Sequence, residues 1–98
     1  MRVRFASRDL AHCYESEREA VRAWGQVVGR RYIDRVSLIR QARSLRDLHG
    51  IRSLRLHQLR GDRAGELAIR LTGQWRLVCR LADGDDVIVE EVSAYYGD

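Results

Sequence analysis

One histidine and several arginines lie close together in the stretch from Leu54 to Leu81, and these residue types could cleave or bind a phosphodiester. The stretch places His57 and Arg76 among short alternating apolar runs that glycines separate. RNA cleavage needs a base for the 2′-hydroxyl proton, a cation for the charge that develops on the phosphate, and a donor for the leaving 5′-oxygen. Imidazole can transfer protons and guanidinium groups can hold the charge. A solvated charged face with a surface histidine would look the same, and spacing alone leaves both interpretations open.

Period-two alternation predicts that these polar side chains share one face of a sheet. In Gln74–Leu81, Arg76 and Arg80 alternate with an apolar set, and neighbouring side chains of a strand point to opposite faces. The two preceding predicted strands show the same alternation of basic and apolar residues. We therefore expect a cationic face around His57. The residues expected to bind RNA on this face are Arg55, Arg70 and Arg80.

Two tyrosines follow the last predicted strand and extend the candidate site. Tyr95 and Tyr96 could stack on bases or donate a proton.

The first half of the chain predicts one strand and then helices. Met1–Ala6 alternates as a strand does, and Ser7 can cap a helix over Arg8–Glu15. Ser16 begins a capping-box sequence, and apolar residues then recur at helical spacing to about Arg43, which predicts one long amphipathic helix.

Glycines modify that prediction. Gly25 and Gly29 lie inside the long helix, where each costs about 1 kcal/mol relative to alanine, and they would permit close packing or a bend. Ser44 and Gly50 bound a further turn or two of helix.

After Gly50 the period changes from 3.6 to 2, which predicts strands to the end of the chain. The predicted strands are Ser53–Leu59, Glu66–Leu71, Gln74–Leu81 and Val87–Ser93. The order β-α-α-β-β-β-β predicts an α+β fold in which the N-terminal strand joins a small antiparallel sheet and the helices cover one face.

Composition indicates one globular domain over residues 1–98, with 45% hydrophobic and 33% charged residues. No apolar run approaches the roughly 20 residues that span a bilayer, and the N-terminus lacks a signal-peptide core, which predicts a cytoplasmic protein. Cys13 and Cys79 lie far apart with no neighbouring ligands, so we expect buried thiols, no metal and no cofactor.

The charge of the chain is basic and unevenly distributed. All 18 basic residues are arginine, and they lie in residues 1–82 against eight acids, whereas residues 83–98 carry six acids and no arginine. Guanidinium groups suit phosphates and stack on bases, so this distribution favours a polyanionic partner, most simply nucleic acid. An arginine-rich solvated surface is the alternative, and composition does not separate the two.

Several segments together resemble a known family. L-H-Q-L-R-G-D-R (56–63), G-x-W-R-L-V (73–78) and E-E-V-S-A-Y-Y-G-D (90–98) resemble the HigB-like branch of the RelE/ParE superfamily of bacterial toxins, which belong to type II toxin–antitoxin systems. V-R-F-A-S-R-D-L and S-E-R-E-A-V-R-A-W-G in the first part of the chain look similar to the same branch. The first two motifs in succession are the most specific, and the likeness covers nearly the whole chain.

The resemblance implies a RelE-like fold and a metal-independent endoribonuclease that cuts mRNA in the ribosomal A site and stops translation. It also implies neutralisation by a cognate antitoxin, expected to be a helix-turn-helix protein. His57 matches the general acid/base histidine of the family, and Arg76 matches the arginine that stabilises the transition state. Arg60 stands where many relatives have a phosphate-contacting lysine. Tyr95 or Tyr96 matches a terminal position that is commonly part of a Tyr–His pair.

Two other functions are compatible with the same resemblance. One is a ParE-like toxin that inhibits DNA gyrase by binding, and the other is a catalytically weakened relative that still binds antitoxin.

Overall fold

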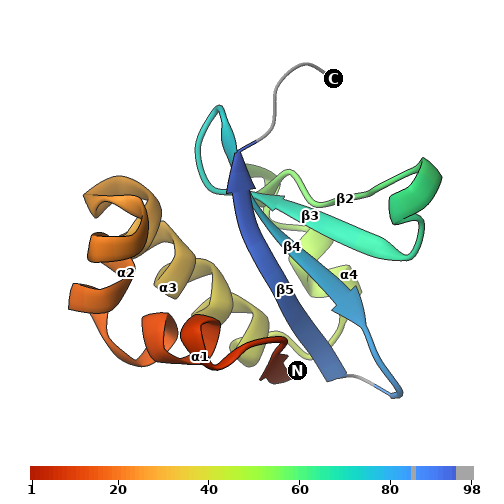
Figure 1. Ribbon diagram of the computed structural model, residues 1–98. Helices are drawn as coiled ribbons and strands as arrows, with labels where there is room; N and C mark the ends of the chain where they lie inside the picture. The colour runs from red at the N-terminus through yellow and green to blue at the C-terminus, as the bar shows by residue number, and fades with distance from the viewer. Residues whose placement is uncertain (85, 95–98) are drawn as a thin grey trace.

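The computed structural model describes residues 1–84 and 86–94, and it consists of a layer of helices packed against one face of a sheet (Figure 1). The helices are α1 (Arg8–Glu15), α2 (Glu17–Trp24), α3 (Gln26–Gln41) and α4 (Leu45–His49), with 3₁₀ turns η1 (Arg52–Leu54) and η2 (Gly61–Arg63). The strands are β1 (Arg2–Phe5), β2 (His57–Gln58), β3 (Glu66–Arg70), β4 (Trp75–Leu81) and β5 (Asp86–Ala94). The predicted α+β class is confirmed.

The sheet has five strands in the order β1-β5-β4-β3-β2. Strands β2 to β5 pair antiparallel with one another, and β1 joins the sheet as expected but runs parallel to β5. The sheet is therefore mixed, and the prediction of a wholly antiparallel sheet was wrong. Two parallel strands must be joined by a long crossover connection. The helices form part of it, because in the sequence they follow β1 and precede the other strands.

The first two helices are capped as the sequence predicts, whereas Ser44 begins α4 without a side-chain capping hydrogen bond, and the long helical stretch is not continuous. The hydroxyl oxygens of Ser7 and Ser16 accept hydrogen bonds from the backbone N–H groups of Leu10 and Glu19, each at 3.2 Å. The predicted long helix is broken at Gly25, which has φ +86° and ψ 170°, a conformation that essentially only glycine adopts. The chain turns there into α3.

Gly29 explains how α3 packs after this break. A Cβ built on Gly29 would lie 2.7 Å from the backbone carbonyl carbon of Ala20, so the two helix backbones are in direct contact at this point. Both roles proposed for the glycines, a bend and close packing, occur in the structure, one at each glycine.

The predicted strand Ser53–Leu59 was also wrong over most of its length. Residues 52–54 form η1, Arg55 has left-handed backbone angles (φ 46°, ψ 43°), and only His57–Gln58 pair as a strand. Leu54 is fully buried in the core, so burying this side chain at the end of η1 takes precedence over extended pairing.

The core lies between the helices and the sheet. Its largest fully buried side chains include Tyr32, Ile39, Leu54 and Leu77. Cys13 and Cys79 are free and buried, as expected, and burial raises the pKa of the Cys79 thiol to about 12. None of the helices described is both long and apolar enough to cross a membrane.

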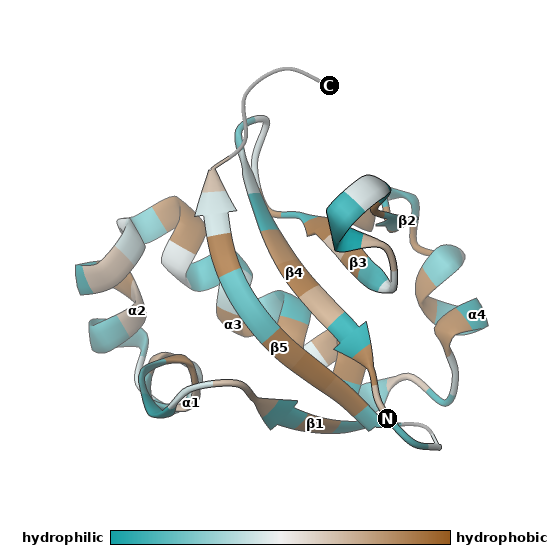
Figure 2. Cartoon of the chain, turned by 45° about the vertical axis from the view of Figure 1, so that its right-hand side comes forward, coloured by the Kyte–Doolittle hydropathy of each residue, from teal (hydrophilic) through white to brown (hydrophobic). Residues whose placement is uncertain are grey.

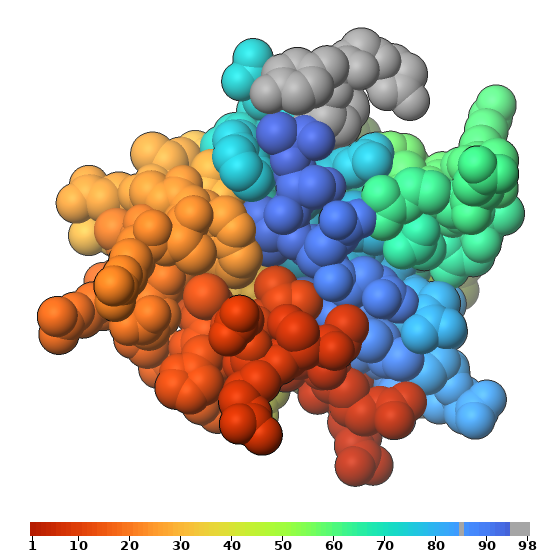
Figure 3. Space-filling view, in the orientation of Figure 1, coloured from red at the N-terminus to blue at the C-terminus, as the bar shows by residue number. Residues whose placement is uncertain are grey.

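The other face of the sheet is largely uncovered. Figure 2 shows α3 behind β4 and β5 and the η2 turn in front of β3, on the side away from the helices. Figure 3 shows β5 exposed along the middle of the molecule. We call this side the open face.

Candidate functional site

A pocket of about 330 Å³ opens at one end of the open face, and its lining is strongly cationic. It is lined by Arg55, His57, Arg70, Gly73 and Arg76. Four of these five residues are predicted site residues, and none of the five is acidic. The pocket can therefore receive an anionic group.

Strand register brings these residues together. His57 pairs with Ala68, Arg70 pairs with Arg76, and Arg76 pairs in turn with Ser93. Directly paired residues of antiparallel strands point to the same face with Cβ atoms about 4.5–5.5 Å apart. The two arginines and the histidine thus lie in adjacent rows of one face.

His57 is held in a defined orientation. Its Nδ1 lies 2.9 Å from the carbonyl oxygen of Arg55. A carbonyl oxygen can only accept, so Nδ1 carries the proton in this contact and Nε2 is the nitrogen with a free lone pair. His57 is exposed. This geometry leaves Nε2 available to take a proton from a bound substrate.

The backbone of Arg55 makes that orientation possible. Arg55 is the only non-glycine among the described residues with positive φ. Left-handed angles cost a non-glycine residue on the order of 1 kcal/mol, and such residues concentrate at functional sites. Here the turn of the chain at Arg55 directs its carbonyl oxygen to the imidazole, and Arg55 itself is part of the pocket lining.

The opposite rim of the pocket is tied to the helical layer. A Cβ built on Gly73 would lie 3.6 Å from a guanidinium nitrogen of Arg70, so the arginine lies over the β3–β4 turn. From α3, Arg31 donates to the carbonyl oxygen of Leu71 at 2.7 Å and Arg35 donates to that of Arg70 at 3.3 Å. These contacts fix the turn that carries the rim.

Arg76 and Arg70 are both more enclosed than the exposed Arg55. Arg76 is half-buried, and its Nε is a buried atom. A guanidinium held partly out of water interacts more strongly with an anion than one on an exposed surface.

A second set of charges holds the loop between β2 and β3 across the open face. Arg63 in η2 donates from Nε to Glu66 at 2.8 Å and also contacts Glu91 on β5. These hydrogen bonds raise the pKa of the Arg63 guanidinium, and the bond from Arg63 lowers the pKa of the Glu66 carboxyl. The loop helps to enclose Ala68 and Val78, which are fully buried although their register places them on the open face.

The remaining predicted site residues lie elsewhere. Arg60 is exposed just before η2 and is not part of the pocket lining. The Arg80 guanidinium contacts Glu90 at 2.7 Å, and Arg80 is four residues along β4 from Arg76, about 13 Å at the usual rise of a strand. Arg80 does not line the pocket with His57 and Arg76, although the register places it two residues from Val78, in the row of His57, as it does Arg76. Tyr95 and Tyr96 lie outside the described residues.

Sequence reasoning missed Gly73, Arg31, Arg35 and the Arg63 contacts. The G-x-W-R motif does contain Gly73, so its place in the lining had a sequence signal. The α3 arginines had none, because no pattern shows which helix arginine reaches the end of a strand.

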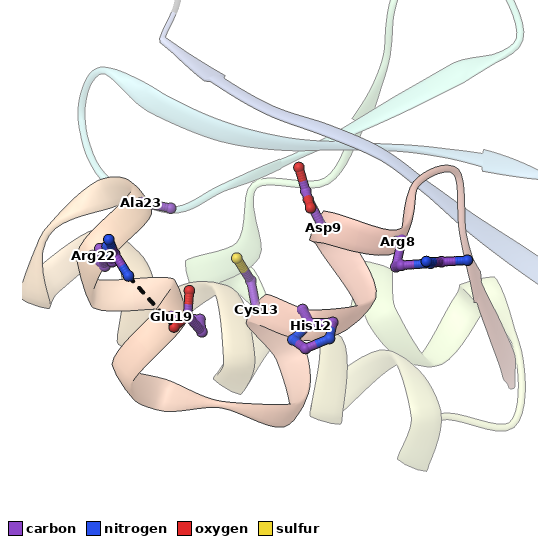
Figure 4. Close-up of a pocket in the computed structure, with 7 residues that line it drawn as sticks. All are labelled: Arg8, Asp9, His12, Cys13, Glu19, Arg22 and Ala23. Carbon is purple, nitrogen blue, oxygen red and sulfur yellow. Dashed lines mark ion pairs between the residues drawn. The ribbon is translucent and has the colours of Figure 1, made fainter.

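A separate hollow of about 430 Å³ lies between α1 and α2 (Figure 4). Its lining mixes Arg8 and Arg22 with Asp9 and Glu19, and Arg22 lies 4.0 Å from Glu19. Cys13 also lines it, and burial, with the nearby acids, raises the pKa of its thiol, which disfavours the reactive thiolate. No three metal-ligating side chains among the described residues are grouped to hold an ion. The cationic pocket remains the better candidate.

Neither a protein-family model nor a curated protein sequence matches the chain significantly. Solved structures do match it over nearly its full length. The fold is that of RelE/ParE-type toxins. A YoeB/ParE toxin from Agrobacterium tumefaciens has a TM-score of 0.61 at 17% identity, covering 98% of this chain and 100% of that one.

Two further solved structures share this fold. The YoeB–YefM complex from Staphylococcus aureus has a TM-score of 0.64 at 16% identity, with 98% of each chain covered. YafQ from E. coli strain BL21(DE3) has a TM-score of 0.61 at 14% identity, covering 96% of this chain and 93% of that chain.

Proposed function

We propose that this chain is the toxin of a type II toxin–antitoxin pair, from the HigB-like branch of the RelE/ParE superfamily. Its activity is ribosome-dependent cleavage of mRNA in the A site, without a metal, in the cytoplasm. The observation that carries the proposal is the hydrogen bond from His57 Nδ1 to the Arg55 carbonyl, which leaves Nε2 free beside three arginines. The toxin fold and the motifs around His57 and Arg76 support it.

The pocket residues have different roles in cleavage. His57 Nε2 removes the proton from the 2′-hydroxyl, and the resulting oxygen attacks the adjacent phosphorus. Arg76, assisted by Arg55 and Arg70, stabilises the charge on the pentacoordinate phosphate. Among the described pocket residues, the imidazole is the only group that can both accept and donate a proton. Once protonated, His57 can therefore donate that proton to the leaving 5′-oxygen. Arg60 binds a flanking phosphate, Arg80 binds another when its ion pair with Glu90 opens, and Tyr95 or Tyr96 stacks on a base.

A cognate antitoxin is part of the proposal. One of the similar structures is a YoeB–YefM complex. We expect a helix-turn-helix protein encoded next to this chain.

The decisive experiment is induction without antitoxin. His57→Ala should lower the rate of mRNA cleavage on translating ribosomes by about 10²–10⁴-fold, and Arg76→Ala by about 10²-fold or more. Both variants should relieve growth arrest. His49→Ala, at the exposed end of α4, is the matched control and should cleave as the wild type does.

The same experiment separates the alternatives. If both variants remain fully toxic, the assignment of the site is wrong. A DNA-damage response with intact mRNA would instead favour a ParE-like gyrase inhibitor, and binding of antitoxin without toxicity would favour a weakened relative.

A further inference from the structure

Strand β3 extends beyond its neighbour β2 at the end of the sheet that carries the cationic pocket. In the paired part His57 lies opposite Ala68, and the same register continued would bring Arg55 opposite Arg70. The chain turns at Arg55 instead. Its N–H donates to the carbonyl oxygen of Arg52 at 3.1 Å, and its own carbonyl oxygen lies against the imidazole of His57. The break that orients the histidine therefore removes the strand partner that the Arg70 backbone would have had.

The alternation of hydrogen bonds along β3 shows which way the Arg70 backbone faces. Leu71 N–H donates to the Trp75 carbonyl at 2.9 Å, on the side of β4. On the other side, the Glu66 carbonyl accepts from Leu59 N–H at 2.9 Å. Alternate residues of an antiparallel strand bond to the same neighbour. Arg70, like Glu66, thus directs its N–H and C=O groups away from β4, toward the position that a longer β2 would occupy.

Two arginines of α3 supply donors at this position. Arg35 Nε donates to the Arg70 carbonyl at 3.3 Å, and Arg31 donates to the next carbonyl, that of Leu71, at 2.7 Å. The Arg35 side chain is 14% exposed, and its guanidinium is oriented by Asp34 at 3.0 Å. Hydrogen bonds from charged donors are stronger than those between neutral groups. The helical layer therefore holds the end of β3 in place of the missing strand.

The side chain of Arg70 explains why this end of β3 needs to be held. Because Leu71 and Trp75 form a hydrogen-bonded pair, Arg70 and Arg76 form the next pair of the non-hydrogen-bonded kind, in which side chains lie closer. Both arginines line the pocket, and like charges directly opposite are unfavourable. A free strand end could relax and move the two guanidinium groups apart. An anion bound between them reverses the sign of the interaction.

We propose that Arg35 and Arg31 are positioning residues of the pocket. They fix the main chain of Arg70 so that its guanidinium stays opposite that of Arg76, where the two bind one phosphate group together. The inference rests on the proposed function, because it takes that group to be the scissile phosphate of RNA. Neither α3 arginine is part of the pocket lining, so both act through Arg70. Cations held in place before the charge develops stabilise a transition state most effectively.

A double-mutant cycle separates positioning from a general contribution to stability. Arg35→Met and Arg31→Met remove the donors but keep the apolar stem and a good helix former. Each should lower the single-turnover rate of cleavage of ribosome-bound mRNA by about tenfold, because the Arg70 guanidinium is displaced. In an Arg70→Ala background the same substitutions should change the rate by less than about twofold, since the group that they position is absent. Thermal melting checks that each variant is folded at the assay temperature.

Two further variants serve as controls for the cycle. Arg30→Met makes the same change on the same helix, at an exposed residue paired with Glu17 at 3.4 Å, and should cleave RNA as the wild type does. Arg35→Lys should retain most of the rate, because an ammonium group can donate to the same carbonyl.

Inorganic phosphate gives a reading that does not depend on RNA cleavage. Its dissociation constant is measured by NMR titration of the arginine Nε–H signals. Arg35→Met should weaken phosphate binding by about threefold or more in the unaltered background and leave it unchanged beside Arg70→Ala. Equal effects of Arg35→Met in both backgrounds, or no phosphate binding by the unaltered chain, would overturn the positioning role. If the unaltered chain binds phosphate with this coupling but does not cleave RNA, the ribonuclease proposal fails and the positioning of Arg70 stands.

Discussion

Two segments that the sequence presents as continuous elements are both interrupted, and the interruptions differ in kind. The helical pattern from residue 16 to 43 breaks at Gly25, and the strand pattern from 53 to 59 breaks at Arg55. At Gly25 the residue type suits the backbone, so the break serves packing. At Arg55 the residue type opposes the backbone, and the break lies beside the imidazole of the candidate site. The break at Gly25 therefore serves the packing of the helices, whereas the break at Arg55 shapes the candidate site.

Gly29→Ala should have the largest effect on stability, because it removes the close packing that the first break allows. The added methyl group would meet the backbone of Ala20 and Val21 at 2.7–2.8 Å. We expect a net loss of about 2–3 kcal/mol in the free energy of unfolding, since overpacking exceeds the gain in helix propensity of about 1 kcal/mol. Thermal melting should show a fall of roughly 10–20 °C. A loss below about 0.5 kcal/mol would mean that α2 and α3 can separate readily.

Substitutions of Arg55 separate backbone strain from charge. Arg55→Gly relieves the left-handed backbone and Arg55→Ala does not, so the glycine variant should be more stable than the alanine variant by about 0.5–1 kcal/mol. Both lack the guanidinium and should cleave RNA about tenfold more slowly. Urea denaturation and ribosome-dependent cleavage measure the two effects. A glycine variant less stable than the alanine variant would contradict the left-handed conformation.

Loss of the Arg63 contacts should have the smallest effect on the free energy of unfolding, and this effect should depend on pH. The pKa of the Glu66 carboxyl is lower in the folded chain than in the unfolded chain. Its contribution to stability is therefore complete above the pKa of the unfolded state and is lost as the pH falls through the pKa of the folded state. Arg63→Gln should therefore cost up to about 1 kcal/mol at pH 7 and progressively less in acid below about pH 4. Denaturation at several pH values tests this. Arg30→Gln, which removes an exposed pair, should show no such trend.

The parts of the fold that follow from local pattern were predictable. Apolar period and serine caps located α1, the start of α2 and the four later strands, although β2 is much shorter than predicted. The direction of β1 was not predictable, because parallel pairing depends on how the intervening helices pack. The position of Arg55 depends on burial of Leu54, which alternation alone does not reveal.

The site was predictable to the extent that strand alternation holds. Alternation placed His57, Arg70 and Arg76 on one face, and the structure brings them to one pocket with Arg55. It did not show that the Arg80 guanidinium pairs with Glu90 instead of lining the pocket. Alternation did not predict the irregular register between β5 and β4, which appears as a shift at Val78 and Cys79.

That shift in β5 has an electrostatic consequence. The register with β4 is irregular at Val78 and Cys79, where one residue of β5 is inserted, so Glu90 and Glu91 both reach the open face. There they neutralise Arg80 and Arg63, and Asp86 does the same for Arg4. Ion pairs between described residues do not involve Arg55 or Arg70. The acidic residues of β5 therefore offset the positive charge of Arg4, Arg63 and Arg80. An approaching polyanion is then attracted most strongly to the end of the sheet beside His57.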